Sequence, residues 1–442
     1  MIKLPEQVNK AICLLKSSGF EAYAVGGAVR DCLLGKVPFD WDIATSARPE
    51  ETEKVFCGER IIETGIKHGT VTVIIDGMPL EITTYRIDGD YTDHRHPQTV
   101  SFSDNLRDDL SRRDFTINTL CCNCDDKIID VFGGKDDLKN KTIRCVGDPD
   151  TRFSEDALRI MRAVRFSAEL GFKIEKSTSD SILKNRQLLS DVSKERLQVE
   201  FTKLITGKYA TDVIRKYHAV IEVFIPELAT LVGCEQHTKY HKYDVFEHTL
   251  HAVDAVDFND RILRLTMFFH DFGKPDAKTT DENGTSHFKG HAVISEKKTR
   301  DILKRLKFDN NTINEVSKLV LIHDMKSPRD KIQAKKMMCS LGDEVYLNLI
   351  KIKRADNMAK ADPHAIDEKL KNMLSFYEEI KATNECYNLK SLAINGDDIK
   401  AFGIAEGKVI KSSLDFLLNG VIEGKCQNRK DVLLEYLKEN TK

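Results

Sequence analysis

Strand signals in this 442-residue chain are confined to roughly its first 145 residues. Ala22–Val25 is a short apolar strand, and residues 71–76 and 80–86 are strand-like runs separated by a Gly-Met-Pro sequence that is typical of a hairpin. After Ile143 glycines become sparse and apolar residues recur with the period of a helix. The sequence therefore predicts an α+β fold, in which a part that mixes strands and helices is followed by an all-helical part.

Amphipathic helices are predicted in both parts. Residues 6–17 place apolar side chains on one face, and residues 155–169 form a second helix with three arginines along one edge. The segment 241–362 is helical, and histidines concentrate there. Residues 395–398 mark a turn and a helix cap.

Composition predicts an ordinary soluble globular protein, with 41% apolar and 31% charged residues. No stretch of the sequence approaches the ~20 consecutive apolar residues that a bilayer requires, and the first residues lack the apolar core of a signal peptide. We therefore expect a cytoplasmic protein with no membrane partner. The formal net charge of -2 means that any contact with RNA must come from local basic patches.

Two carboxylates in the first part predict a metal site. Asp40 and Asp42 are two residues apart, so on a strand their side chains would point to the same face. Such a pair suits Mg²⁺, which in phosphoryl-type transfer bridges the attacking hydroxyl and the triphosphate. Glu81, on a neighbouring predicted strand, would supply a third carboxylate. Taken alone, an Asp-x-Asp sequence is more often a solvated turn.

The glycine pair upstream favours the metal-site interpretation. Gly26 and Gly27 follow a predicted strand, and glycine lets backbone N–H groups approach a phosphate at the start of the next helix. Arg30, Arg112 and Arg113 are then available to bind phosphate oxygens. Together these residues predict a site for a nucleoside triphosphate.

Four motifs follow one another between residues 24 and 200. They are residues 24–31 with 40–45 (AVGGAVRD and DWDIAT), residues 112–118 (RRDFTIN), residues 148–159 (DPDTRFSEDALR), and Glu195-Arg196 with Glu200. In this order they resemble the motifs of class II tRNA nucleotidyltransferases and bacterial poly(A) polymerases.

The resemblance implies a small five-stranded head of the polymerase-β type, with a mixed sheet, over residues 1–145. It also implies a helical neck and body that recognise the base over residues 146–235, and a helical tail that contacts tRNA over residues 363–442. Asp40, Asp42 and Glu81 would be the catalytic carboxylates, the first two as Mg²⁺ ligands. The nucleotide-binding residues of the head would be Gly26, Gly27, Arg30, Arg112, Arg113, Asp114 and Asn118.

The neck carries the residues that the resemblance places at the base. Asp156 and Arg159 lie three apart and hence on one face of the predicted helix. Cytosine and adenine share an amino donor beside a ring-nitrogen acceptor, whereas guanine and uracil present the reverse order. One Asp acceptor with one Arg donor would therefore accept CTP and ATP and reject GTP and UTP. Outside the motif, the same pair would be a solvated ion pair of little energetic consequence. Arg162 and Arg165 are expected to contact phosphates or to support the helix.

A polar, turn-rich segment at residues 88–97 lies between a predicted strand and the second motif. It resembles the flexible loop that members of the family need for the switch from C to A, and that CC-adding members lack. His96 stands where family members often have Arg, which is a departure from the pattern.

The histidines of the second half form an ordered set, in which His248, His270-Asp271 and Asp356 resemble the metal ligands of the HD superfamily of phosphohydrolases. The resemblance places an HD-type domain at residues 236–362, and His291 and His323 match the further ligands of members with two metals. Imidazole with carboxylate suits Mn²⁺, Fe²⁺, Ni²⁺ or Zn²⁺. A single His-Asp pair is more often a cap or a surface pair, and this fold can also persist as a scaffold beneath tRNA.

The resemblance predicts template-independent addition of C, C and A to tRNA 3′ ends from CTP and ATP. Phosphohydrolase activity on RNA ends is a second activity of the HD-type domain under the same hypothesis. The alternatives are a poly(A) polymerase, a relative that adds only CC or only A, and, from another class, an HD phosphohydrolase whose head merely binds RNA. The sequence leaves the oligomeric state open.

Overall fold

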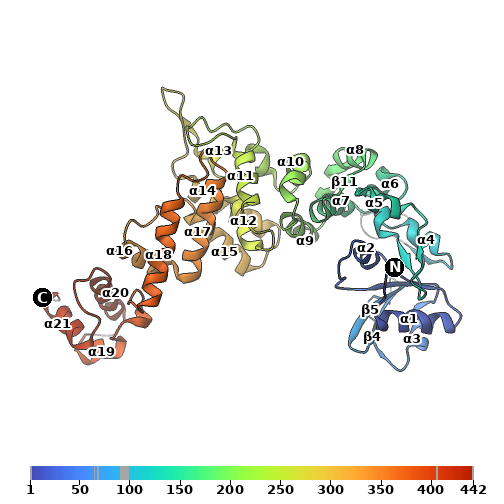
Figure 1. The fold of residues 1–442 in the computed structure, drawn as a ribbon, viewed down its shortest axis with the longest axis horizontal. Coiled ribbons are helices and arrows are strands. Elements are labelled where there is room, and N and C mark those ends of the chain that lie inside the picture. Colours follow the sequence, from blue (N-terminus) through green and yellow to red (C-terminus); the bar gives the residue numbers. More distant parts are fainter. Residues whose placement is uncertain (1, 64, 67–68, 90–98, 405–406, 441–442) are drawn as a thin grey trace. The chain divides into compact units, whose positions relative to one another are not determined.

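The computed structural model describes residues 2–63, 65–66, 69–89, 99–404 and 407–440. The chain divides into two compact units, Met1–Ala229 with Arg305–Lys307, and Thr230–Lys304 with Phe308–Lys442. The first unit holds the main sheet, and the second is built almost wholly from helices (Figure 1). This arrangement confirms the predicted α+β class.

The sheet of the first unit has seven strands in the order β3-β4-β5-β2-β1-β8-β9. Neighbouring strands run antiparallel except β2 and β5, which are parallel, so the sheet is mixed as expected. The strands are β1 (Ala22–Val25), β2 (Asp42–Thr45), β3 (Arg60–Ile62), β4 (Thr70–Ile75), β5 (Met78–Thr84), β8 (Cys121–Cys122) and β9 (Ile128–Ile129). The expectation of five strands is wrong, because the two-residue strands β8 and β9 extend the sheet beyond β1.

Alternate burial along β4 shows how this sheet meets its core. Val71, Val73 and Ile75 are buried, whereas the residues between them are partly exposed. Their side chains share one apolar core with the helices α1 (Glu6–Ser17), α2 (Gly27–Leu33) and α3 (Pro49–Val55). Each buried aliphatic side chain of this kind stabilises the fold by about 1.5–3 kcal/mol. The helix predicted over residues 6–17 is confirmed.

The predicted hairpin is β4–β5, and its turn is shorter than expected. Ile75 pairs with Met78, so only Asp76 and Gly77 form the turn. Both turn residues have positive φ, 47° and 82°, as tight two-residue hairpins require. Met78 and Pro79, expected in the turn, are already strand residues.

A break in the helical part of the first unit separates α6 (Pro149–Glu155) from α7 (Leu158–Leu170). Asp156 lies at this break with an extended backbone, φ -134° and ψ 101°. The single helix predicted for residues 155–169 is therefore wrong at its start. The other helices of this unit are α4 (Leu106–Ser111), α5 (Gly134–Lys139), α8 (Lys176–Asn185), α9 (Lys194–Ile205) and α10 (Ala210–Ile221).

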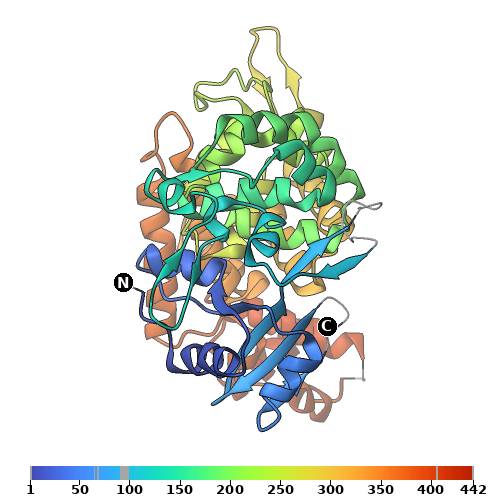
Figure 2. The same cartoon turned by 90° about the vertical axis from the view of Figure 1, so that its right-hand side faces the viewer.

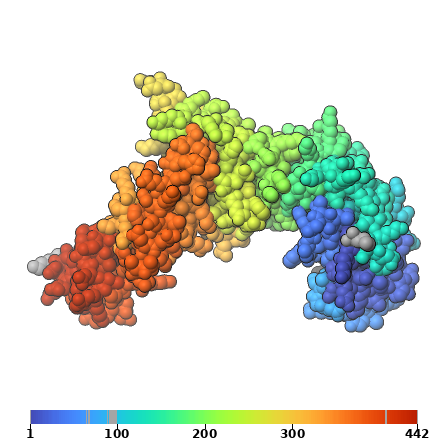
Figure 3. All heavy atoms as spheres, viewed as in Figure 1, coloured from blue at the N-terminus to red at the C-terminus, as the bar shows by residue number. Residues whose placement is uncertain are grey.

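Strand structure also continues past the point where the sequence signals end. β11 (Lys173–Ile174) pairs in parallel with β10 (Thr142–Ile143). In the second unit, β12 (Thr279–Thr280) and β13 (Ser286–His287) form a hairpin inside the segment predicted to be helical. This hairpin, drawn in yellow, projects from the helices of its unit (Figures 1, 2 and 3).

The helices of the second unit follow the predicted periodicity closely. They are α11 (Val245–Asp254), α12 (Arg261–Phe269), α13 (Lys274–Ala277), α14 (His291–Arg305), α15 (Asn310–Ile322), α16 (Lys331–Leu341), α17 (Asp343–Met358) and α18 (Asp367–Ala382). The C-terminal helices α19 (Gly396–Ala401), α20 (Lys408–Ile422) and α21 (Lys430–Asn440) pack around a core of their own. Asn395 caps α19 through a capping box with Asp398, as predicted. Within the described residues, every helix is too short or too polar to span a bilayer.

Candidate active site

One pocket of about 480 Å³ in the first unit brings the predicted head and neck residues together. Its lining consists of Gly26, Gly27, Arg30, Asp40, Asp42, Arg112, Arg113, Asp114, Asn118, Asp156, Arg159, Arg162, Arg165 and Phe166. Of the residues that the sequence predicts for this site, only Glu81 lies outside the lining. The pocket therefore unites four carboxylates with six arginines.

The carboxylates lie where β2 begins. Asp42 is the first residue of β2, and Glu81 is its direct partner on the parallel strand β5. Asp40 precedes the strand and is exposed, so the expectation that both aspartates sit on one strand is wrong, although both line the pocket. Burial raises the pKa of Asp42 to about 6, and Glu81 and Asp40 add to this rise while Arg113 opposes it. A bound cation would favour the ionised form of the Asp42 carboxylate, so this group of carboxylates is a suitable setting for one.

Gly26 lets the chain pass close to the arginines. Its φ of 83° lies in the region that favours glycine, and a Cβ atom there would come within 3.2 Å of Arg113 Nη1. Helix α2 starts at the next residue and carries Arg30, which donates from Nη1 to Asn118 Oδ1 at 2.8 Å. Gly26 is thus required by backbone geometry and by close packing.

Asp109 anchors two of the arginines and was missed by sequence reasoning. Its carboxylate is fully buried and lies 2.6 Å from Arg112 Nη2 and 3.2 Å from Arg113 Nη2. Burial would raise the pKa of Asp109, but the two guanidinium groups outweigh this effect and lower it. The spacing of three and four residues on α4 and its end is the signal that could have found it.

Asp114 and Asn118 hold further arginines in the pocket. Arg162 Nη2 lies 2.6 Å from Asp114 Oδ2, and Asn118 Nδ2 donates to Asp114 Oδ1 at 2.9 Å. Burial opposes ionisation of Asp114, but Arg162 and the Asn118 hydrogen bond outweigh it and lower the pKa to about 2. Asp114 and Asn118 thus fix the directions of Arg162 and Arg30.

Asp156 and Arg159 both line the pocket but pair with other residues. Asp156 Oδ2 lies 3.1 Å from Arg196 Nη2, and its Oδ1 accepts from the backbone N–H of Leu158. Arg159 donates to Glu155 at 2.9 Å and to the Arg112 carbonyl at 2.7 Å. Hence the alternative of a solvated Asp156–Arg159 ion pair is wrong, and each side chain is held separately at the pocket wall.

Phe166 is the one lining residue that the sequence did not predict for the site. The guanidinium carbon of Arg165 lies 3.9 Å from its ring centroid, and those of Arg30 and Arg162 lie at 4.9 and 5.3 Å. The ring face attracts these cations and offers them a rigid support. In the sequence Phe166 reads as one of the apolar residues of a helix, so nothing there marks this contact.

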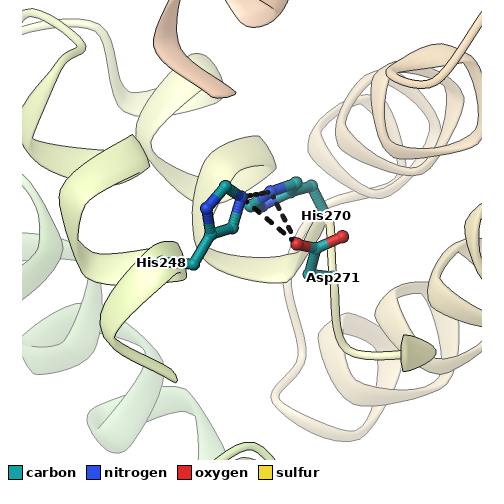
Figure 4. A group of neighbouring side chains, drawn as sticks. All are labelled: His248, His270 and Asp271. Carbon is teal, nitrogen blue, oxygen red and sulfur yellow. Dashed lines mark hydrogen bonds and ion pairs between the residues drawn. The ribbon is translucent and has the colours of Figure 1, made fainter. Parts of the chain in front are cut away.

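A second group of titratable side chains lies in the second unit (Figure 4). His248 projects from α11, while His270 and Asp271 follow the end of α12. His248 Nε2 and His270 Nε2 lie 3.4 and 3.1 Å from Asp271 Oδ2, and His248 Nε2 lies 3.0 Å from Asp356 Oδ1. Asp271 also belongs to a second triad with His291 and His323. All six residues predicted for the HD-type site are therefore neighbours.

Backbone carbonyls fix the tautomer of all four histidines. Each Nδ1 atom lies within hydrogen-bond distance of a carbonyl oxygen. The pairs are His270 with Met267 at 2.6 Å, His291 with Phe288 at 2.8 Å, His323 with Val320 at 2.6 Å and His248 with Ala359 at 3.2 Å. Each Nδ1 must donate its proton there, which leaves the Nε2 atom with a lone pair. These lone pairs face one another, at 3.1 Å between His291 and His323 and 3.4 Å between His248 and His270.

Such an arrangement fits a cation. Facing lone pairs repel unless a positive charge lies near them. Asp271 is buried, its Oδ2 faces Lys274 Nζ, and its Oδ1 has no hydrogen-bond partner among the described residues. Burial lowers the pKa of His270, but Asp271 and Asp356 outweigh it and raise that pKa to about 9, so without a metal ion a proton on His270 Nε2 would supply this positive charge. Carbonyl-anchored imidazoles with buried carboxylates are the surroundings that transition-metal ions take in proteins.

Three further residues near this cluster were not predicted as its ligands. Lys274 Nζ lies 2.7 Å from Asp271 Oδ2 and donates to Gln236 Oε1 at 2.8 Å. The ring of His241 lies 5.3 Å from that of His248, and its Nε2 is buried with no hydrogen-bond partner among the described residues. His241 lies seven residues before His248 in an irregular segment, so helical spacing gave no signal for it.

Three family models match the chain. They are the "Poly A polymerase head domain" over residues 22–144, the "Probable RNA and SrmB- binding site of polymerase A" over residues 171–231, and "tRNA nucleotidyltransferase domain 2 putative" over residues 279–437. The first covers the sheet, and the other two cover helical segments of the chain.

Full-length relatives and solved structures agree with these matches. The CCA-adding enzymes of Geobacillus kaustophilus and Ligilactobacillus salivarius are 33% and 34% identical, each over 99% of this chain and 97% of the relative. The crystal structure of the Bacillus stearothermophilus CCA-adding enzyme in complex with CTP is 30% identical, with a TM-score of 0.68 over 99% of this chain and 97% of that one. The Thermotoga maritima CCA-adding enzyme shares the fold, with a TM-score of 0.64 over 100% of this chain and 97% of that one, at 21% identity. This chain is a nucleotidyltransferase that belongs to the bacterial CCA-adding enzymes of the poly(A) polymerase family.

Proposed function

We propose that the pocket of the first unit adds C, C and A to the 3′ ends of tRNA from CTP and ATP. The observation that carries this proposal is the union, in one pocket, of the carboxylates Asp40 and Asp42 with the arginines and with Asp156. A transferase of this kind needs a site for metal, a site for triphosphate and a site for the base within reach of one another.

Asp40, Asp42 and Glu81 would hold the divalent cation of the reaction, for which Mg²⁺ is our proposal. When bound, such a cation neutralises the triphosphate and favours ionisation of the attacking hydroxyl. The arginines then bind the non-bridging oxygens of the triphosphate, and Asp109 and Asp114 keep their guanidinium groups turned toward it.

Base selection is assigned to Asp156 and Arg159. The carboxylate accepts from the exocyclic amino group of cytosine or adenine, and the guanidinium donates to the adjacent ring nitrogen. Both side chains are held by residues outside the pair, namely Arg196 for Asp156 and Glu155 for Arg159. Because they are held in place before the base arrives, the selection needs no template.

Nucleotide binding tests this assignment directly. We expect equilibrium dialysis to show CTP and ATP bound at least about tenfold more tightly than UTP and GTP, which corresponds to one charged hydrogen bond. Equal affinities for all four triphosphates would mean that the base is selected elsewhere.

The other predicted parts of the first activity remain proposals. The switching loop includes residues 90–98, which lie outside the described residues. We propose the loop on its resemblance alone. On the same basis we propose four domains, with the boundaries 1–145, 146–235, 236–362 and 363–442. The last of these would contact tRNA. Deleting Asp93 to Pro97 should keep the addition of two C residues and suppress the final A, which a tRNA ending in CC would reveal.

We propose a second function for the cluster around Asp271, metal-dependent hydrolysis of a phosphoester at RNA ends. Its support is the pair of triads that share Asp271, with four lone-pair Nε2 atoms turned inward. His248, His270, Asp271 and Asp356 would hold one ion and His291 and His323 a second, with Mn²⁺, Fe²⁺, Ni²⁺ or Zn²⁺ as candidates. When bound, these ions lower the pKa of water and neutralise phosphate.

The test combines metal content with hydrolysis. Purified protein should carry a transition metal and, with Mn²⁺ or Ni²⁺, hydrolyse a 2′,3′-cyclic or terminal phosphate, while the His270→Ala/Asp271→Ala variant should do neither. A wild-type protein without metal and without hydrolysis would make this domain a scaffold.

A further inference from the structure

A polar pocket of about 450 Å³ lies next to the proposed metal centre. His323 and Asp356, both proposed metal ligands, are part of its lining. The rest comes from the segment after α15, from α17 and its end, and from the start of α18. Its volume falls within the range of about 300–1,000 Å³ that small ligands occupy. The pocket is therefore large enough for more than the phosphate at the metal centre.

Basic side chains dominate this pocket. Its lining has two carboxylates, Asp324 and Asp356, against five cations, which are Lys326, Arg329, Lys353, Lys360 and Lys369. On α17 and its end, Lys353, Asp356 and Lys360 lie at intervals of three and four residues, which places them along one helix face.

The cations divide into two kinds by their partners. Lys360 Nζ lies 2.6 Å from Asp356 Oδ2, so it forms an ion pair with a proposed metal ligand. Lys353 and Lys369, in contrast, have no ion-pair partner within the part of the chain that the structure describes. Burial lowers the pKa of Lys353, and Lys360 and Lys369 lower it further although Asp356 and Asp324 oppose them. An anion bound in the pocket would therefore offset the repulsion that Lys353 meets from Lys360 and Lys369.

The pocket offers little to a nucleobase. None of the described residues that line it is Phe, Tyr or Trp, and its apolar lining is limited to Met325, Pro328 and Ile366. Bases that are recognised in single strands usually stack on aromatic rings. The lining thus suits phosphate oxygens rather than bases.

We propose that this pocket selects substrates that carry a second phosphate beside the one at the metal centre. Lys353 and Lys369 bind this second phosphate, and the base is not recognised. The inference rests on the proposed phosphohydrolase function for the position of the first phosphate. Two sources share this chemistry, the phosphorylated 3′ end of an RNA strand and the diphosphate of a free nucleotide.

Hydrolysis by the full-length protein loaded with Mn²⁺ provides the first test. The probes are the dinucleotides ApAp and UpUp, each with a 3′-terminal phosphate, together with adenosine 3′-monophosphate and adenosine 5′-diphosphate. We expect kcat/KM for ApAp or for the diphosphate to exceed that for the monophosphate at least about tenfold, and ApAp and UpUp to react alike. The better of ApAp and the diphosphate identifies the source of the second phosphate.

The variant Lys369→Met removes an exposed charge from the pocket, and Lys371→Met, on the same helix but outside the lining, is its matched control. Lys369→Met should lose most of the preference for the two-phosphate probes while its rate on the monophosphate stays unchanged. Lys371→Met should behave as wild type. Lys353→Met should act as Lys369→Met does, and Lys353→Arg should restore the preference.

Binding separates this inference from the hydrolase proposal. With EDTA present, ApAp or the diphosphate should bind wild type and Lys371→Met several-fold more tightly than Lys369→Met. That result without any hydrolysis would support the pocket and overturn the phosphohydrolase function. Hydrolysis at equal kcat/KM for one-phosphate and two-phosphate probes, or unchanged binding by Lys369→Met, would overturn the inference and leave the hydrolase standing.

Discussion

At the scale of single residues, the pocket of the first unit depends on acidic side chains that never need to touch a substrate. Asp109 and Asp114 are buried, and each is bonded to arginines of the lining. A guanidinium group held in this way loses little freedom when it binds phosphate, so its contribution to binding is larger. The sequence placed the arginines correctly, but it could not show which carboxylates hold them.

Asp42→Ala should reduce the incorporation of both C and A by at least about 100-fold. The substitution removes one of the carboxylates that would hold the cation in the transition state. Binding of tRNA should change little, since phosphate contacts elsewhere dominate that affinity. Single-turnover addition and filter binding measure the two quantities. Asp180→Ala, an exposed position on α8, is the control and should match wild type.

Arg159→Ala should lower the use of CTP and ATP and relax the discrimination against UTP and GTP. A lost charged hydrogen bond costs about 1.5–3 kcal/mol, or roughly 10- to 100-fold in kcat/KM. The ratio of kcat/KM for CTP to that for UTP is the quantity to compare. A variant with wild-type selectivity would show that Arg159 supports the pocket wall without contacting the base.

At the scale of elements, the break between α6 and α7 is what sets Asp156 at the pocket. The sequence around it contains no Pro or Gly, so helical periodicity continued straight through the break. At the break Asp156 accepts from the backbone N–H of Leu158 and also pairs with Arg196, 40 residues away. The prediction that Asp40 lies on a strand was also wrong, since the strand begins two residues later, at Asp42. Helices, the hairpin and the ligand set were predictable from local pattern and motif. The pairing of Asp156 with Arg196 was not, because it joins residues far apart in the sequence.

The ion pair between α7 and α9 should be the costliest contact to break in this part of the chain. Arg165 Nε lies 2.6 Å from Glu200 Oε2, and both side chains are over nine-tenths buried. Glu200→Ala would leave a buried guanidinium short of a partner, so the free energy of unfolding should fall by about 3 kcal/mol. Asp212→Ala, in the exposed pair with Arg215, should cost less than about 1 kcal/mol.

Urea unfolding followed by tryptophan fluorescence can measure this difference. Trp41 is the single tryptophan of the sequence and is buried in the same unit as Arg165 and Glu200, so its emission reports on that unit. A loss for Glu200→Ala no larger than that for Asp212→Ala would contradict the account of this contact.

At the scale of the whole molecule, the two proposed activities lie in different compact units. The double variant His270→Ala/Asp271→Ala should therefore lose transition metal and phosphoester hydrolysis and keep wild-type addition of C and A. Metal analysis and both activity assays on one preparation test this independence. A parallel loss of nucleotide addition would mean that the cluster around Asp271 also supports the first unit.

Nucleotide addition to a tRNA without its 3′-terminal CCA tests the central claim most directly. Purified protein is incubated with this tRNA, Mg²⁺ and each nucleoside triphosphate alone or CTP with ATP together, and the 3′ ends are sequenced. We predict two C residues with CTP alone, CCA with CTP and ATP together, and no extension with UTP or GTP. A run of A residues from ATP alone, an end that stops at CC when both are present, or no extension at all would contradict the account.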